Sequence, residues 1–180
     1  MRIIGGKWKR LVLLSPPDGA GIRPTADRVR ESVLQMLEPE LQGARVLDLF
    51  AGTGALGWEA LSRGASWVSF VDKSPLACKL IKENATRLKA DPQSYEVILS
   101  SAVAFARLKS GYHIVFVDPP YAGPDSWWEP WKNNPGLSCA GGLVIRERDK
   151  RYEDEDPPLG WELEDLRKYG HTAVEFWRVP

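Results

Sequence analysis

The 180-residue sequence predicts an α/β fold in which helices cover both faces of a mostly parallel, doubly wound sheet of seven strands. From residue 44 onward, short apolar runs alternate with segments of helical periodicity. The runs are nearly continuous, as in Ile114-Val-Phe-Val117, which is typical of parallel strands buried on both faces. The length suits one domain with a small appendage.

The first part of the chain is expected to form that appendage. Residues 2–14 have the pattern of two short strands around Gly5-Gly6, a dipeptide that tolerates the positive φ of a hairpin turn. We therefore assign residues 1–22 to a basic N-terminal β-hairpin extension and residues 23–180 to the main domain.

The main domain is expected to open with a helix that Thr25 caps and Pro39 stops, because Val29, Val33 and Leu37 recur at helical spacing. The following elements alternate, and the last two strands form an antiparallel pair joined at Tyr169-Gly170. The expected strands are 44–50, 67–71, 95–99, 113–117, 142–146, 160–167 and 172–179. The expected helices between them are 55–64, 74–90 and 101–109.

Charge is unevenly distributed although the formal net charge is zero. Residues 1–30 contain seven Lys and Arg against two Asp, whereas residues 147–165 contain nine acidic residues against three basic ones. A zero net charge argues against a protein that coats nucleic acid, but the basic end is a candidate surface for a polyanion. Two solvated faces explain the same pattern equally well.

Several classes of protein are disfavoured. No apolar run is long enough to span a membrane, and the N-terminus has no signal-peptide pattern, so a cytoplasmic protein without membrane partners is expected. Cys78 and Cys139 lie far apart and have no metal-ligand spacing. With only two histidines in the chain, we expect no metal site.

A glycine loop follows the first strand of the alternating region. Gly52, Gly54 and Gly57 fit the pattern G-x-G-x-x-G, and Asp72 lies at the end of the next strand. Such glycines let the backbone approach a ligand, and a carboxylate in the position of Asp72 can accept hydrogen bonds from both ribose hydroxyls. An NAD(P)-dependent oxidoreductase must therefore be considered.

Asp48, inside the strand before this loop, favours a different ligand. Its carboxylate would repel a pyrophosphate but can bind the ammonium of a methionine moiety, directly or through water. The loop also lacks the Lys-Ser/Thr of nucleotide-hydrolysing phosphate loops. S-adenosylmethionine is thus the favoured cofactor, with the oxidoreductase and a purely structural tight turn as alternatives.

Asp118-Pro119-Pro120-Tyr121 follows the buried strand 113–117, at the edge where ligands bind in open α/β sheets. The exocyclic amine of a purine is a poor nucleophile because its lone pair is delocalised into the ring. Two acceptors aimed at its N–H bonds, the Asp118 carboxylate and the Pro119 carbonyl, would hold it toward the methyl donor and stabilise the developing positive charge.

The other residues of this tetrapeptide support the same interpretation. Each proline restricts the residue before it to an extended conformation, which fixes the direction of the Pro119 carbonyl. The Tyr121 ring would stack on the base, which must be unpaired or flipped out of a helix. Taken alone, the tetrapeptide fits a proline-rich turn with a surface aromatic equally well.

Together these segments resemble the RsmD family of 16S ribosomal RNA guanine-N2 methyltransferases. The resemblance rests on Arg2-Ile-Ile-Gly-Gly-Lys-Trp8, Arg23-Pro-Thr-Ala-Asp-Arg-Val-Arg-Glu31, Leu47-Asp-Leu-Phe-Ala-Gly-Thr-Gly-Ala-Leu-Gly57, Glu59-Ala-Leu-Ser-Arg63 and Phe116-Val-Asp-Pro-Pro-Tyr121. It implies a Rossmann-like class I methyltransferase domain behind an N-terminal hairpin. It also implies methylation of one guanine of 16S rRNA, family target position 966, during assembly of the small subunit.

The resemblance implies roles for particular residues. The tetrapeptide Asp118, Pro119, Pro120 and Tyr121 would be catalytic. The S-adenosylmethionine site would comprise Asp48, Phe50, Ala51, Gly52, Thr53, Gly54, Asp72, Lys73, Ser101 and Ala102. Such enzymes often have Asp or Asn after the third strand to bind the adenine amino group, whereas Ser101 stands there in this chain and would accept that bond more weakly.

The expected partner is 16S rRNA within a small-subunit assembly particle, bound by a monomer. The expected RNA contacts are Arg2, Lys7, Lys9, Arg10, Arg23, Arg28 and Arg30. A non-catalytic RNA-binding assembly factor is a further alternative, against which the intact tetrapeptide argues. Trp127, Trp128 and Trp131 fit core or lid packing better than base stacking, and His113 fits a hydrogen-bonded strand-edge histidine.

Overall fold

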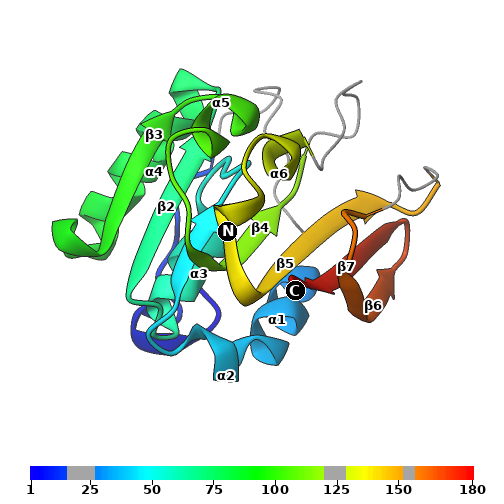
Figure 1. The fold of residues 1–180 in the computed structure, drawn as a ribbon. Coiled ribbons are helices and arrows are strands. Elements are labelled where there is room, and N and C mark those ends of the chain that lie inside the picture. Colours follow the sequence, from blue (N-terminus) through cyan, green and yellow to red (C-terminus); the bar gives the residue numbers. More distant parts are fainter. Residues whose placement is uncertain (16–26, 120–128, 152–156) are drawn as a thin grey trace.

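A seven-stranded sheet forms the centre of the computed structural model, which describes residues 1–15, 27–119, 129–151 and 157–180 (Figure 1). The strand order is β3-β2-β1-β4-β5-β7-β6, with neighbours parallel as far as β5 and antiparallel from β5 to β6. The strands are β1 (Arg45–Asp48), β2 (Trp67–Asp72), β3 (Tyr95–Leu99), β4 (Tyr112–Val117), β5 (Ser138–Asp149), β6 (Glu162–Tyr169) and β7 (Thr172–Arg178). The predicted doubly wound, mostly parallel sheet is confirmed.

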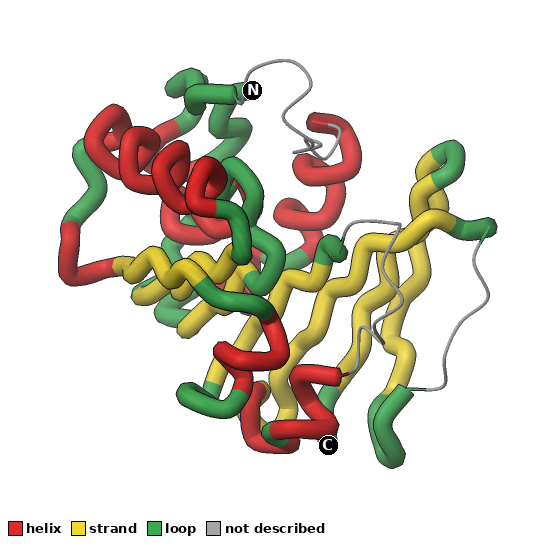
Figure 2. Tube along the Cα trace, turned by 90° about the horizontal axis from the view of Figure 1, so that it is seen from above, coloured by secondary structure: helices red, strands yellow, loops and turns green. Residues whose placement is uncertain are grey.

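Helices cover both faces of this sheet (Figure 2). The helices are α1 (Asp27–Met36), α2 (Glu38–Leu41), α3 (Ala55–Ser62), α4 (Pro75–Leu88), α5 (Ala102–Ala106) and α6 (Glu129–Asn133). Short 3-10 helices occupy Gly6–Trp8, Pro92–Ser94 and Pro135–Leu137. Residues of α1, α3 and α4 share one hydrophobic cluster, and residues of α5 and α6 share the other, so we name the two faces the α1/α3 face and the α5/α6 face.

Strand residues alternate between these two faces. In β4, Ile114 and Phe116 belong to the cluster on the α1/α3 face, whereas Val115 and Val117 belong to the opposite cluster. All four are buried, which explains why the strand reads as a continuous apolar run. The alternation also determines which face each polar residue at a strand end will join.

The N-terminal segment differs from the expected tight hairpin. Its ends are antiparallel, with an isolated bridge between Arg2 and Val12 and a hydrogen bond from the Leu13 N–H to the Met1 carbonyl. The connection is not a two-residue turn at Gly5-Gly6, because a 3-10 helix lies between the paired ends. Ile3, Trp8 and Leu13 are buried in the cluster of the α1/α3 face, so the segment packs onto the body of the protein.

Pro39 does not stop the first helix as expected. The α1 helix ends at Met36, and Pro39 lies in the first turn of the short helix α2, where its missing N–H costs no hydrogen bond. Thr25, the expected cap, lies outside the described residues. Among the residues described, no helix has both the length and the apolar character needed to cross a membrane.

Candidate active site at the carboxyl edge of the sheet

Asp48 and Asp118 lie at the same edge of the sheet, at or just beyond the carboxyl ends of neighbouring parallel strands. Asp48 is the last residue of β1 and is paired in register with Phe116 of β4, two residues before Asp118. Asp48 is buried and Asp118 is half-buried. The fold thus brings together two carboxylates that are far apart in the sequence.

The glycine loop lies between β1 and α3. Gly52 and Gly54 have φ of 54° and 77°, in the left-handed region where a side chain is strained. The Gly54 N–H donates to the Ala51 carbonyl at 2.6 Å, which closes the turn into α3. A Cβ on Gly54 would also lie 2.8 Å from Nε1 of Trp58, so the loop requires glycine for both its conformation and its packing.

Gly57 has a different role, because it lets α3 pack closely on the sheet. A Cβ at this position would lie 2.2 Å from Cε1 of Phe70 in β2. Its N–H donates to Oδ2 of Asp48 at 3.0 Å. Gly57 therefore holds the helix against the strand and orients the Asp48 carboxylate.

Asp72, at the end of β2, faces the same loop. Its Oδ2 accepts the Gly52 N–H and its Oδ1 accepts the Ser74 N–H, each at 2.8 Å. Because each carboxylate oxygen can accept two hydrogen bonds, Asp72 retains capacity for a ligand's hydroxyls. The second predicted carboxylate of the cofactor site is thus held beside the glycine loop.

Burial raises the pKa of Asp48 to about 7. Removal from water is the largest cause, and the negative charges of Asp118 and Asp72 add to it, while the Gly57 hydrogen bond acts in the opposite direction. Three carboxylates near one another favour a positively charged ligand group. An ammonium fits this edge better than a pyrophosphate does.

The other predicted cofactor residues surround this edge or lie at the next strand. Ala51 and Thr53 are buried and Phe50 is half-buried in the loop, while Lys73 is exposed beyond β2. Ser101 is exposed, and its Oγ caps α5 by accepting the Ala104 N–H at 3.2 Å, with buried Ala102 as the first residue of that helix. Ser101 therefore has a structural partner as well as its predicted place.

The tetrapeptide is described in part. Asp118 and Pro119 are half-buried beyond the end of β4. Pro120 and Tyr121 lie outside the described residues, as do Trp127 and Trp128. The two acceptors that sequence reasoning assigned to the amine are therefore at the expected edge of the sheet.

Four of the predicted RNA contacts are on the surface of the N-terminal segment. Arg2, Lys7, Lys9 and Arg10 are exposed. Nζ of Lys7 lies 4.2 Å from the centroid of the Trp8 ring, which holds the lysine on the surface by a cation–π contact. Arg23 and the side chain of Arg28 lie outside the described part of the chain.

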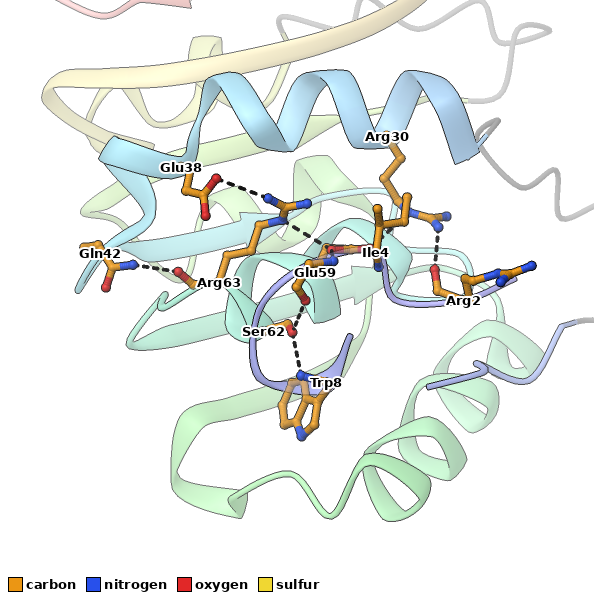
Figure 3. Close-up of polar contacts among 10 residues, drawn as sticks. Arg2, Ile4, Trp8, Arg30, Glu38, Gln42, Glu59, Ser62 and Arg63 are labelled. Carbon is orange, nitrogen blue, oxygen red and sulfur yellow. Dashed lines mark hydrogen bonds and ion pairs between the residues drawn. The ribbon is translucent and has the colours of Figure 1, made fainter. Parts of the chain in front are cut away.

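The structure contradicts the prediction that Arg30 contacts RNA. Its side chain is fully buried, its Nη2 donates to the Arg2 carbonyl at 2.7 Å, and its Nε lies 3.8 Å from Glu59 (Figure 3). The sequence pattern did not predict this burial. Arg30 follows the buried Val29 in α1, and both side chains lie on the side of the helix that faces the protein. Arg30 is a buried structural cation and presents no surface to a phosphate.

Glu59 is a residue whose individual role sequence reasoning missed. It is fully buried in α3, accepts the N–H groups of Ile4 and Gly5, and lies 3.4 Å from Nε of Arg63 as well as near Arg30 (Figure 3). We call Glu59, Arg30 and Arg63 the N-terminal clasp. A single acidic residue within the apolar run of α3 was the available signal.

Two further polar residues attach the N-terminal segment to the site. Ser62 donates to the Gly5 carbonyl at 2.6 Å and accepts the Trp8 N–H at 3.0 Å. Asn84 of α4 accepts the Leu14 N–H at 2.7 Å and donates to the Thr53 carbonyl at 3.3 Å. Through Asn84, the segment is connected directly to the glycine loop.

Two expectations about neighbouring residues are confirmed. Trp131 is buried, donates to Ser138 at 3.1 Å and packs edge-to-face on Trp161, as core packing predicts. His113 accepts the Arg45 N–H at 3.0 Å, as expected for a strand-edge histidine. Within the described ranges, no three His, Cys, Asp or Glu side chains group so as to hold a metal ion.

Known sequences resemble this chain over most of its length. The family model described as conserved hypothetical protein 95 matches residues 1–178. Ribosomal RNA small subunit methyltransferase D of Escherichia coli (strain K12) is 43% identical over 122 residues, which cover 67% of this chain and 60% of that protein. YlbH of Bacillus subtilis (strain 168) is 41% identical over 191 residues, covering 99% of this chain and 98% of YlbH.

Solved structures show the same arrangement of strands and helices. "Putative methyltransferase yhhF from Escherichia coli" has a TM-score of 0.88 and 31% identity, covering 99% of this chain and 97% of that one. A hypothetical protein of Thermus thermophilus, TTHA0928, has a TM-score of 0.78 and 30% identity, covering 98% of each chain. These matches show that the chain belongs to the RsmD family and has the Rossmann-like class I methyltransferase fold.

Proposed function

We propose that the protein transfers a methyl group from S-adenosylmethionine to the exocyclic N2 of one guanine in 16S rRNA, family target position 966, during assembly of the small subunit. The observation that carries the proposal is the meeting of Asp48, Asp72 and Asp118 beside the glycine loop. The printed names of the Escherichia coli and Haemophilus influenzae relatives describe small-subunit rRNA methyltransferases, which supports the substrate class.

The residues at this edge fit S-adenosylmethionine. Asp48 would bind the ammonium of its methionine end, and Asp72 would bind the ribose hydroxyls. The positive φ of Gly52 and Gly54 keeps side chains away from the ligand. Ser101 and Ala102 would contact the adenine. When bound, the cofactor supplies an electrophilic methyl on a sulfonium.

The chain's own residues would then position the amine. The Asp118 carboxylate and the Pro119 carbonyl accept the two N–H bonds of guanine N2, so that its lone pair points at the methyl carbon. The Asp118 carboxylate would stabilise the positive charge that develops on N2 as N2 takes the methyl group, and the methylated N2 would then lose one proton to water.

Replacing Asp118 with Ala should abolish methyl transfer while largely sparing cofactor affinity, because Asp118 contacts the amine and not the donor. Mass mapping of 16S rRNA methylation in small-subunit particles, with and without the protein, measures the reaction, and titration calorimetry measures cofactor binding. Full activity of the variant would overturn the mechanism. Binding of NADH without binding of S-adenosylmethionine or its demethylated product would instead favour the oxidoreductase.

The exposed basic residues of the N-terminal segment would bind rRNA. In this proposal the protein is a monomer, with residues 1–22 as the RNA-binding extension and residues 23–180 as the catalytic domain. Replacing Lys7 and Lys9 with Ala should weaken particle binding and reduce the salt slope of log K by about 2, because each phosphate contact contributes about one unit. A matched control replaces exposed Lys79 and Lys82 of α4. Equal salt slopes of log K for both variants would refute the proposed role of the N-terminal segment in rRNA binding.

A further inference from the structure

A buried amide connects the glycine loop to the N-terminal segment. Asn84 of α4 is fully buried, and its side chain contacts main-chain groups of two segments that are distant in the sequence. Its Oδ1 accepts the Leu14 N–H at 2.7 Å, and its Nδ2 donates to the Leu14 carbonyl at 3.4 Å and to the Thr53 carbonyl at 3.3 Å. An amide has one acceptor oxygen and two donor hydrogens, so each contact matches the chemistry of its partner.

The peptide group between Thr53 and Gly54 is held at both ends. Its carbonyl accepts the hydrogen bond from Asn84, and its N–H donates to the Ala51 carbonyl at 2.6 Å. Gly54 has a φ of 77°, and rotation of the peptide group before it would change that angle. The two hydrogen bonds therefore fix the path of the loop at the residues that would approach the cofactor.

The arrangement around Gly57 explains why a donor from α4 serves Thr53. In a regular α-helix, the N–H of residue 57 donates to the carbonyl of residue 53. Here the Gly57 N–H donates to Oδ2 of Asp48 at 3.0 Å instead. Thr53 is buried, and a buried carbonyl without a donor costs free energy. Asn84 thus supplies the donor that the Asp48 carboxylate has drawn away.

The α4 helix supports the loop by packing as well. Ile81 and Asn84 are three residues apart, so they lie on the same side of the helix. A Cβ on Gly54 would lie 3.1 Å from Cγ1 of Ile81, beside the Thr53 contact of Asn84. The docking of Leu14 and the geometry of the glycine loop therefore depend on one side chain of α4.

We propose that Asn84 is a positioning residue through which the docked N-terminal segment raises the affinity of the glycine loop for S-adenosylmethionine. This inference rests on the proposed function, which supplies the cofactor. The segment need not touch the cofactor, because Asn84 acts through the peptide group of Thr53 and Gly54. The N-terminal segment thus has a second role beside the proposed rRNA binding.

Calorimetric titration with S-adenosylmethionine tests the proposal. Asn84→Leu has a similar volume but no amide, so it should bind the cofactor on the order of tenfold more weakly. Ser62→Ala is the matched control, because Ser62 is also buried and bonds the N-terminal segment at Gly5 and Trp8. The control should stay within about twofold of the wild type, with urea denaturation confirming that both variants are folded. An equal loss of affinity in both variants, or none in Asn84→Leu, would overturn the proposal.

Hydrogen exchange of the wild-type protein provides a test that no folding defect can obscure. Coupling between two sites is reciprocal, so saturating S-adenosylhomocysteine, the demethylated product, should slow exchange of the Leu14 N–H on the order of tenfold. The Trp8 N–H, which Ser62 accepts, should change by less than about twofold. Unchanged exchange at Leu14, or equal slowing at both amides, would contradict the role of Asn84. If the wild-type protein binds neither S-adenosylmethionine nor S-adenosylhomocysteine, the proposed function itself fails.

Discussion

Two buried carboxylates, Asp48 at the end of β1 and Glu59 within α3, have contrasting surroundings. Glu59 lies between the guanidinium groups of Arg30 and Arg63 and accepts backbone N–H groups of the N-terminal segment. Asp48 accepts the Gly57 N–H and lies near two further carboxylates, which contribute to its pKa of about 7. The guanidinium groups beside Glu59 compensate its charge, whereas Asp48 lies among like charges and, in the proposed function, a ligand's ammonium would compensate it.

Under the proposed function, this difference separates the structural charge of Glu59 from the ligand-binding charge of Asp48. A buried charge with complete partners fixes the position of the elements that supply them, here the N-terminal segment, α1 and α3. A buried carboxylate among other carboxylates costs stability, but the same free energy becomes available when a cation binds. Replacing each residue should therefore affect stability in opposite directions.

The largest effect is expected for Glu59→Ala. The change removes the buried carboxylate 3.8 Å from Nε of Arg30 and the acceptor of two backbone N–H groups, so unfolding should become easier by about 3–5 kcal/mol. Urea denaturation measures the change. Glu59→Gln keeps the shape and one acceptor, so its stability should lie between that of the wild type and that of Glu59→Ala. A loss below about 1 kcal/mol for Glu59→Ala would show that the clasp is not structural.

Asp48→Asn should stabilise the protein at alkaline pH. The raised pKa means that the folded state retains a proton that the unfolded state loses, so wild-type stability falls as pH rises from about 4 to about 7. Asparagine removes this titration and can still accept the Gly57 N–H. The gain in stability should vanish near pH 4, where folded wild-type Asp48 is protonated. At pH 8 the gain should reach up to about 2 kcal/mol, because the cost of burying the amide N–H donors of asparagine offsets part of it. Thermal unfolding at both pH values tests the sign.

The same variant should bind S-adenosylmethionine more weakly. In the proposed function the ammonium of S-adenosylmethionine binds the ionised form of Asp48, so wild-type affinity should fall by up to about tenfold per pH unit below about pH 7. Calorimetric titrations between pH 5.5 and 8 should show this slope for the wild type and a flatter one for Asp48→Asn. Parallel slopes would mean that Asp48 does not face the ammonium.

The smallest effect is expected for Glu38→Ala at the rim of the N-terminal clasp. Glu38 lies 3.5 Å from Nη1 of Arg63, but its side chain is 57% exposed. Exposed ion pairs contribute about 0–1 kcal/mol, so this change should cost less than about 0.5 kcal/mol. Urea denaturation of Glu38→Ala and Glu59→Ala compares the exposed edge of the N-terminal clasp with its buried centre. A cost similar to that of Glu59→Ala would contradict the distinction drawn from burial.

Local patterns predicted most of the fold and the glycine loop between β1 and α3. The run Ile114–Val117 predicted a buried parallel strand, and the spacing of Gly52, Gly54 and Gly57 predicted the turn into α3. These features depend on neighbours in the sequence. Arg30 could not be assigned in this way, because the partners that bury it come from α3 and from the N-terminal segment.

The sequence by itself determined the alternation of strands and helices and the placement of acidic residues at strand ends, because period-two and helical patterns are properties of adjacent residues. The tertiary structure decided which of those residues meet. Asp118 lies near Asp48 only because β4 lies beside β1 in one register, and Arg30 is buried only because the N-terminal segment closes over α1 and α3. Strand order and long-range packing arise from contacts between distant segments, and no local pattern contains them.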